Sequence, residues 1–222
     1  MSFVKLKHTY EYMPHTIISQ GKADSFAGKY GLGVRHNTIW TPEKEKEVLY
    51  KVIPERYWKD FQVTRMSINS LLLPHVDNDF ITTINFYYDP QNYRTVFFKP
   101  KPGANSWKTE EDRHDAAGLN MKDENVNIEE LKTRVKEFVA EKQNMPTCEE
   151  ITYVDAVYTF DDVYEIACFI AQPNEAYLLD VRVAHNVEPL GGEAKLRKAF
   201  SLRSKIYDYA QVYEMLQETG NL

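Results

Sequence analysis

The chain carries the sequence FQVTRMSINSLLLPHVDNDFITTINFYY at residues 61–88. Its two flanks, residues 61–73 and 80–88, are rich in β-branched, aromatic and aliphatic side chains, which fit the pleated surface of a β-sheet. Asn78 and Asp79, which lie between the flanks, are residue types that favour tight turns. We therefore expect two strands joined by a short turn, with the motif HVD at the end of the first strand.

Similar β-leaning runs recur along the rest of the chain, whereas helical signals are few. The strand-like runs lie at 95–103, 151–160, 165–171, 175–187 and 198–207, and the helical signals lie at 41–60, 126–143 and 209–217. Pro54 is expected to end the first helix. This distribution predicts a mainly β (α+β) protein, with a closed or double-sheet architecture and flanking α-helices.

The segment from about 100 to 150 interrupts the series of strands. Residues 104–126 are polar, and residues 126–143 have apolar side chains at helical spacing. A length of 222 residues fits one domain. We therefore interpret residues 1–222 as a single domain with an insertion at about 100–150, and we expect the insertion on the substrate side because such loops commonly provide specificity.

The composition argues against several classes of protein. The net charge of −6 is the wrong sign for a non-specific nucleic-acid coat protein. Cys148 and Cys168 form no CxxC pair, so neither a disulfide framework nor a thiolate zinc site is indicated. The sequence has no secretory signal pattern and no apolar stretch near the ~20 residues of a membrane span. We expect a cytoplasmic protein without a membrane partner.

His75 and Asp77 are candidate metal ligands. Residues two apart in an extended chain point to the same side, so both side chains could reach one ion. Such a pair also arises often by chance, and the alternative is a His and an Asp that stabilise a turn. His185, which lies 110 residues later in another β-leaning run, favours the metal site. Two imidazoles and one carboxylate are the ligand set of non-haem iron(II) oxygenases.

Arg197 and Arg203 are candidate ligands for an acidic co-substrate. In a strand, Arg197, Ser201 and Arg203 share one face, and the alternating positions Phe200 and Leu202 are apolar. An inward arginine needs an anionic partner, and a guanidinium pairs bidentately with a carboxylate. A dicarboxylate co-substrate could be that partner. The alternative is an internal Asp or Glu.

The order of these motifs resembles the Fe(II)- and 2-oxoglutarate-dependent oxygenase superfamily. The stretch TTINFYYDP at 82–90 resembles the prolyl-hydroxylase-like branch, and the RxxxxxR pair resembles the alkylated-base demethylases. The resemblance covers residues 63–98 and 177–205. It implies a double-stranded β-helix (a cupin-like jelly roll) and Fe(II) held by the three residues that would also be catalytic, His75, Asp77 and His185. It further implies 2-oxoglutarate as co-substrate, with its distal carboxylate on Arg197.

The same resemblance suggests further contacts to the co-substrate. Tyr87 lies where related enzymes often place a hydroxyl against the distal carboxylate, and Thr83 and Asn85 share its face of the strand. The alternative for Tyr87 is an ordinary core aromatic. Ala199 departs from the family because many members have serine there, so Arg203 is the candidate for the missing contact.

These observations predict a dioxygenase that hydroxylates a C–H bond of a peptidyl or free amino-acid side chain and releases succinate and carbon dioxide. Its partners would be 2-oxoglutarate, oxygen and a small-molecule or peptide substrate. Two alternatives remain open. One is a nucleic-acid base demethylase or hydroxylase of the same superfamily, and the other is a non-catalytic cupin-like barrel.

Overall fold

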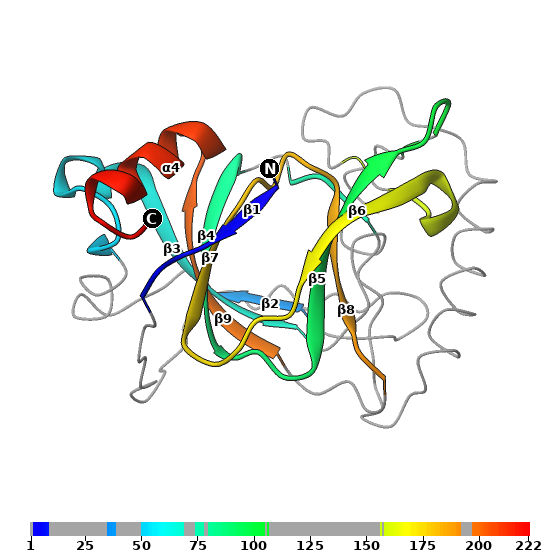
Figure 1. The fold of residues 1–222 in the computed structure, drawn as a ribbon, viewed down its shortest axis with the longest axis horizontal. Coiled ribbons are helices and arrows are strands. Elements are labelled where there is room, and N and C mark those ends of the chain that lie inside the picture. Colours follow the sequence, from blue (N-terminus) through cyan, green and yellow to red (C-terminus); the bar gives the residue numbers. More distant parts are fainter. Residues whose placement is uncertain are drawn as a thin grey trace.

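A computed structural model describes residues 2–8, 35–38, 50–68, 74–77, 80–104, 106, 156, 158–191 and 197–222 (Figure 1). Within these residues the protein is mainly β, its strands pair antiparallel, and the α-helix α4 (Tyr209–Glu218) lies near the C-terminus. No helix among the described residues has the length and apolar composition needed to cross a membrane.

The strands form two sheets. The larger has the order β1-β7-β4-β9-β3-β2 and the smaller the order β6-β5-β8. Their bounds are β1 (Phe3–Lys5), β2 (Arg35–Thr38), β3 (Phe61–Ile68), β4 (Thr82–Asp89), β5 (Tyr93–Pro100), β6 (Val163–Phe169), β7 (Glu175–Leu179), β8 (His185–Pro189) and β9 (Arg197–Ser204). An isolated bridge between His75 and His185 adds the segment 74–77 to the free edge of β8.

The chain alternates between the two sheets. After β3 in the large sheet it enters the small sheet at 74–77 and returns to the large sheet as β4. After β5 and β6 in the small sheet, the chain enters the large sheet as β7, crosses to the small sheet as β8 and returns to the large sheet as β9. As a result, the metal-ligand candidates lie on the small sheet and Arg197 lies on the large one.

Aromatic side chains fill the space between the sheets. Tyr87 and Tyr177 of the large sheet pack with Phe97 and Phe169 of the small sheet, and Phe3 of β1 joins them. In Figure 1, β1 lies where the edge of the large sheet approaches β5 and β6. A buried aromatic core therefore lies between the sheets that bear the candidate site residues.

The opposite face of the large sheet packs under α4. Val212, Met215 and Leu216 of the helix contact the sheet residues Ile84 and Leu202 within one buried cluster. The helix begins at Asp208 with a capping box shared with Gln211, which satisfies backbone N–H groups of its first turn.

Most predicted strands and the C-terminal helix are confirmed within one to three residues of their expected bounds. The run 175–187 is different, because it forms two strands in different sheets, β7 and β8, separated by a turn at 180–184. After Pro54, whose conformation is extended, the chain forms a 3-10 helix, Glu55–Asp60. The described end of the expected strand 151–160 does not form a strand, because Phe160 begins a second 3-10 helix, Phe160–Asp162.

Several expectations lie outside the described residues. They are the helix start at 41–49, the turn at Asn78 and Asp79, and almost all of the expected insertion, including the helix at 126–143.

Candidate functional site

The structure brings the three predicted metal ligands together. One donor atom from each of His75, Asp77 and His185 lies within 4.8 Å of the other two. His75 Nε2 is 3.7 Å from Asp77 Oδ1, and the two imidazole centroids are 4.6 Å apart. Both histidines are buried, and Asp77 is largely so.

Backbone hydrogen bonds set this geometry. His75 and His185 exchange both of their N–H···O bonds, 2.9 and 2.8 Å long, so the two residues lie directly opposite each other with side chains on one face. Asp77, two residues further on, donates its N–H to the Val181 carbonyl at 3.0 Å. The expected sharing of a face by His75 and Asp77 is thus realised on the edge of β8.

A second interaction orients the His185 ring. Its Nδ1 lies 3.0 Å from the Val183 carbonyl oxygen, which can only accept a hydrogen bond. Nδ1 therefore carries a proton, and in the neutral ring Nε2 has the lone pair that can bind a metal. Metal-bound histidines are commonly fixed in this way.

The donor set fits a divalent metal. Ligand atoms lie ~2.0–2.2 Å from such ions, so neighbouring donors on one ion are ~3 Å apart. The donor atoms of His75, Asp77 and His185 lie within 4.8 Å of one another, which is ~2 Å wider than that arrangement. Two imidazoles and a carboxylate suit iron(II) and leave coordination positions open for other ligands.

Arg203 binds the metal-ligand candidate Asp77. Its Nη2 donates to Asp77 Oδ2 at 2.8 Å, and its guanidinium stacks 3.8 Å from the Phe80 ring centroid. Both charged side chains are largely buried. The structure therefore gives Arg203 an internal carboxylate, the alternative that the sequence left open for both arginines. Its suggested contact to the co-substrate is not supported by this pairing.

Arg197 has a different environment. Its side chain is 2% exposed and reaches from β9 to β5, where Nη2 donates to Thr95 Oγ1 at 3.0 Å. The guanidinium lies 4.6 Å from the Tyr87 ring centroid. Nε and Nη1 are buried and have no hydrogen-bond partner, and no carboxylate of the described residues pairs with this arginine. A buried cation with two unused donors is costly unless an anion completes it.

Tyr93 adds a further buried polar group without a partner near Arg197. Its hydroxyl is buried without a partner, and it shares a face of β5 with Thr95. Burial raises the pKa of the Tyr93 phenol, and the nearby Arg197 charge opposes that rise. The sequence analysis missed both Tyr93 and Thr95. Their period-two spacing in YRTVFF was a visible signal, but only the packing of the large sheet against the small sheet shows that Arg197 reaches β5.

The polar residues of β4 contact one another. Ser201 and Thr83 donate to Asn85 Oδ1 at 2.6 and 3.3 Å, and Asn85 Nδ2 donates to the Tyr87 hydroxyl at 3.2 Å. Tyr87 presents its ring, not its hydroxyl, to Arg197. The predicted roles of Thr83, Asn85 and Tyr87 at a co-substrate therefore stay predictions.

Comparisons with known proteins add little to this picture. No family model matches the chain, and neither does any curated protein. Among solved structures, one match is procruciferin, an 11S globulin from Brassica napus, with a TM-score of 0.30 and 8% sequence identity. The match covers 86% of this chain and 31% of that chain. A likeness this weak carries no argument, so function has to be argued from the site.

Proposed function

We propose that this protein is an Fe(II)- and 2-oxoglutarate-dependent oxygenase with a double-stranded β-helix fold. The strand order supports this fold. The chain passes from the large sheet to the small sheet and back twice, once from β3 to β4 and once from β7 to β9, and two such passages form the paired windings of this barrel. Cupin-like barrels without catalytic function share this architecture, so the proposed activity rests on the site.

The observation that carries the proposal is the proximity of two complementary subsites. Phe97 pairs with His185 across β5 and β8, and Tyr93 and Thr95 point to the same side as Phe97. Thr95 lies two residues before Phe97, which is ~7 Å along the strand. A five-carbon dicarboxylate with one end at the histidines would place its other carboxylate near Arg197. That carboxylate would supply the acceptors that Arg197 and Tyr93 lack.

His75, Asp77 and His185 would hold the iron, which supplies oxygen activation and the oxidation of a C–H bond. In the net reaction, 2-oxoglutarate, oxygen and R–H give succinate, carbon dioxide and R–OH. Arg197 would bind the distal carboxylate through Nε and Nη1, and the Tyr93 hydroxyl would donate to it. The Val183 carbonyl keeps His185 in its metal-binding tautomer, and the aromatic core excludes water from the buried side.

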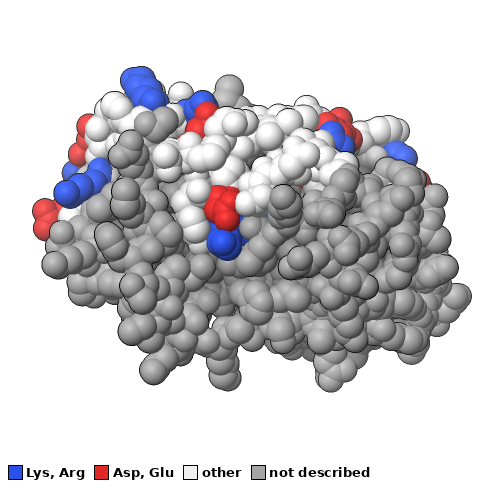
Figure 2. Space-filling view, turned by 90° about the horizontal axis from the view of Figure 1, so that it is seen from below, with Lys and Arg blue, Asp and Glu red and all other residues white. Residues whose placement is uncertain are grey.

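For the substrate we favour a peptidyl or free amino-acid side chain. The resemblance of residues 82–90 to the prolyl-hydroxylase-like branch supports this choice, as does the net charge of −6. Where the described residues form the face in Figure 2, Lys and Arg side chains lie beside Asp and Glu. A base demethylase, which the RxxxxxR spacing favours, would need a basic surface for phosphates.

The test is succinate formation by purified protein supplied with Fe(II), 2-oxoglutarate and ascorbate. Wild-type protein should form succinate slowly alone and faster with the true substrate in a panel of peptides, amino acids and alkylated oligonucleotides. Asp77→Ala is the matched negative control. If wild-type protein binds 2-oxoglutarate but forms no succinate with any member of the panel, the non-catalytic barrel is favoured. Stimulation by oligonucleotides alone would favour the demethylase.

A further inference from the structure

The turn at 180–184, called here the metal-site turn, contacts two of the three candidate ligands. Val181 accepts the Asp77 N–H at 3.0 Å, and the Val183 carbonyl lies 3.0 Å from His185 Nδ1. The Asp77 backbone and the His185 ring therefore take their positions from two carbonyl groups of one short turn.

The N-terminal strand β1 holds the metal-site turn. Asp180, its first residue, donates its N–H to the Ser2 carbonyl at 2.9 Å. The Asp180 carbonyl accepts the Val183 N–H, and its carboxylate accepts the Arg182 N–H. Ser2 directly precedes β1, which pairs with β7 in the register Phe3 to Leu179. The hydrogen bond from Asp180 to Ser2 continues this ladder beyond the end of β7.

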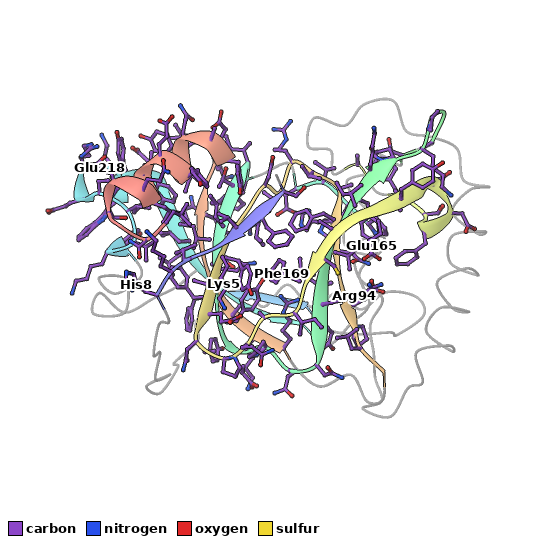
Figure 3. The ribbon with its side chains drawn as sticks, viewed as in Figure 1. Lys5, His8, Arg94, Glu165, Phe169 and Glu218 are labelled. Carbon is purple, nitrogen blue, oxygen red and sulfur yellow. The ribbon has the colours of Figure 1, made fainter. Side chains whose placement is uncertain are left out.

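A side chain of β1 gives a second route to the site. Phe3 stacks on Phe97 at a centroid distance of 5.5 Å and contacts Phe169 at 4.8 Å. Phe97 in turn lies 6.0 Å from the His185 ring. In Figure 3, the labelled Phe169 lies on the side of β6 that is turned toward the large sheet. At its other end β1 is fastened by the ion pair of Lys5 with Glu175.

We propose that β1 is a positioning element for the metal site, acting through the Ser2–Asp180 hydrogen bond and through the Phe3 ring. The inference rests on the metal site of the proposed function and adds to it a strand far away in the sequence. If β1 loosens, the metal-site turn loses the partner of Asp180, and the carbonyls that orient Asp77 and His185 become less well fixed. Metal affinity should then fall although all three ligands are intact.

Phe3 and Val4 offer a matched pair of variants. They are neighbours on one strand, but Phe3 packs between the sheets whereas Val4 packs against the cluster under α4. Phe3→Ala should raise the Co(II) dissociation constant about 10-fold or more, the usual size of effects from groups behind the ligands. Val4→Ala should change it less than about 2-fold. Phe3→Leu, which keeps much of the apolar volume, should lie between them and serves if Phe3→Ala does not fold.

The measurements are Co(II) titration by absorbance without 2-oxoglutarate, thermal unfolding, and hydrogen exchange at 180–184. Faster exchange of the Asp180 amide in the Phe3 variants, but not in Val4→Ala, is expected. Equal cobalt affinity in wild-type protein and folded Phe3 variants overturns the inference, as does an equal loss in Val4→Ala. Absence of cobalt binding by wild-type protein overturns the metal site itself. If cobalt binds as expected but succinate never forms, only the proposed reaction fails.

Discussion

Arg197 is the residue on which the choice of co-substrate depends. Lysine would keep the charge but could not form bidentate hydrogen bonds to the carboxylate, so Arg197→Lys should weaken 2-oxoglutarate binding by ~1.5–3 kcal/mol. Arg197→Ala should cost more, and both should leave metal affinity nearly unchanged. The measurement is calorimetric titration of the metal-loaded protein without oxygen, with circular dichroism as the folding control. Unchanged affinity in folded Arg197→Ala protein would show that another group anchors the ligand or that 2-oxoglutarate is not the ligand.

Tyr93 permits a sharper test, because function and stability should move in opposite directions. Its hydroxyl is buried without a partner, so Tyr93→Phe removes an unsatisfied polar group and should keep or raise the unfolding temperature. The same change removes a hydrogen-bond donor near Arg197 and should weaken 2-oxoglutarate binding by about 1 kcal/mol. Tyr87→Phe, at the neighbouring ring, is the comparison. A loss of stability without loss of affinity would mean that the Tyr93 hydroxyl is structural.

Arg203 is expected to affect the affinity for the metal and not the affinity for the co-substrate. Removing it leaves Asp77 Oδ2 without its buried partner, so Arg203→Ala should lower Co(II) affinity by about 10–100-fold in the absence of 2-oxoglutarate. Arg203→Lys should recover part of the loss because it restores the charge. If Arg203→Ala changed only the affinity for 2-oxoglutarate, the contact suggested by the sequence resemblance would be right after all.

At the scale of elements, the pairing of β1 with β7 should be sensitive to acid. Burial raises the pKa of Glu175, but hydrogen bonds from Lys5, the Gln172 backbone and Tyr177 outweigh it and leave the pKa below its usual value. A carboxyl with a lowered folded-state pKa stabilises the fold above the ordinary value of about 4.3 and loses that contribution as the pH falls through the lowered value.

Glu175→Gln should therefore lower the free energy of unfolding by roughly 1 kcal/mol near neutral pH, and by progressively less in acid. Thermal unfolding of both proteins from about pH 6 to about pH 3 measures the difference. A difference independent of pH would show that the carboxylate charge is not what fastens β1.

At the scale of the whole molecule, the expected insertion leaves and re-enters the fold at one place. Pro100 and Val163 are paired residues of β5 and β6, and Lys101 donates its N–H to Asp162 at 2.8 Å. The returning chain borders the metal site, since Val76 donates to the Ala156 carbonyl at 2.9 Å. These contacts place the returning end of the segment beside the candidate site, although residues 107–155 themselves lie outside the described residues.

Replacing residues 107–154 by a short Gly/Ser linker should therefore leave the two sheets folded, because β5 and β6, which flank the segment, are already paired. Metal and 2-oxoglutarate affinities should stay within about 3-fold of wild type, whereas substrate-stimulated succinate formation should be lost. Calorimetry and the succinate assay measure the two effects. Loss of 2-oxoglutarate binding in a folded, trimmed protein would assign the segment to the core.

The sequence by itself determined which side chains share a face. Alternation along an extended chain places His75 beside Asp77, and Arg197 beside Ser201 and Arg203, whatever the rest of the fold does. The strand positions could also be predicted from the sequence, because β-branched and aromatic runs bounded by turn residues are local signals. This information was sufficient to select the metal ligands and Arg197 as candidates.

The tertiary structure alone decided which of these faces meet. The bridge of His75 with His185, the reach of Arg197 to Thr95 and Tyr93, and the pairing of Arg203 with Asp77 all join residues far apart in the chain. The first depends on which strands are neighbours and in what register, and the other two depend on how the faces of the two sheets meet. A shift of one residue in register would turn each of these side chains to the other face. Local patterns therefore could not tell which arginine has an internal acid and which one retains unused donors.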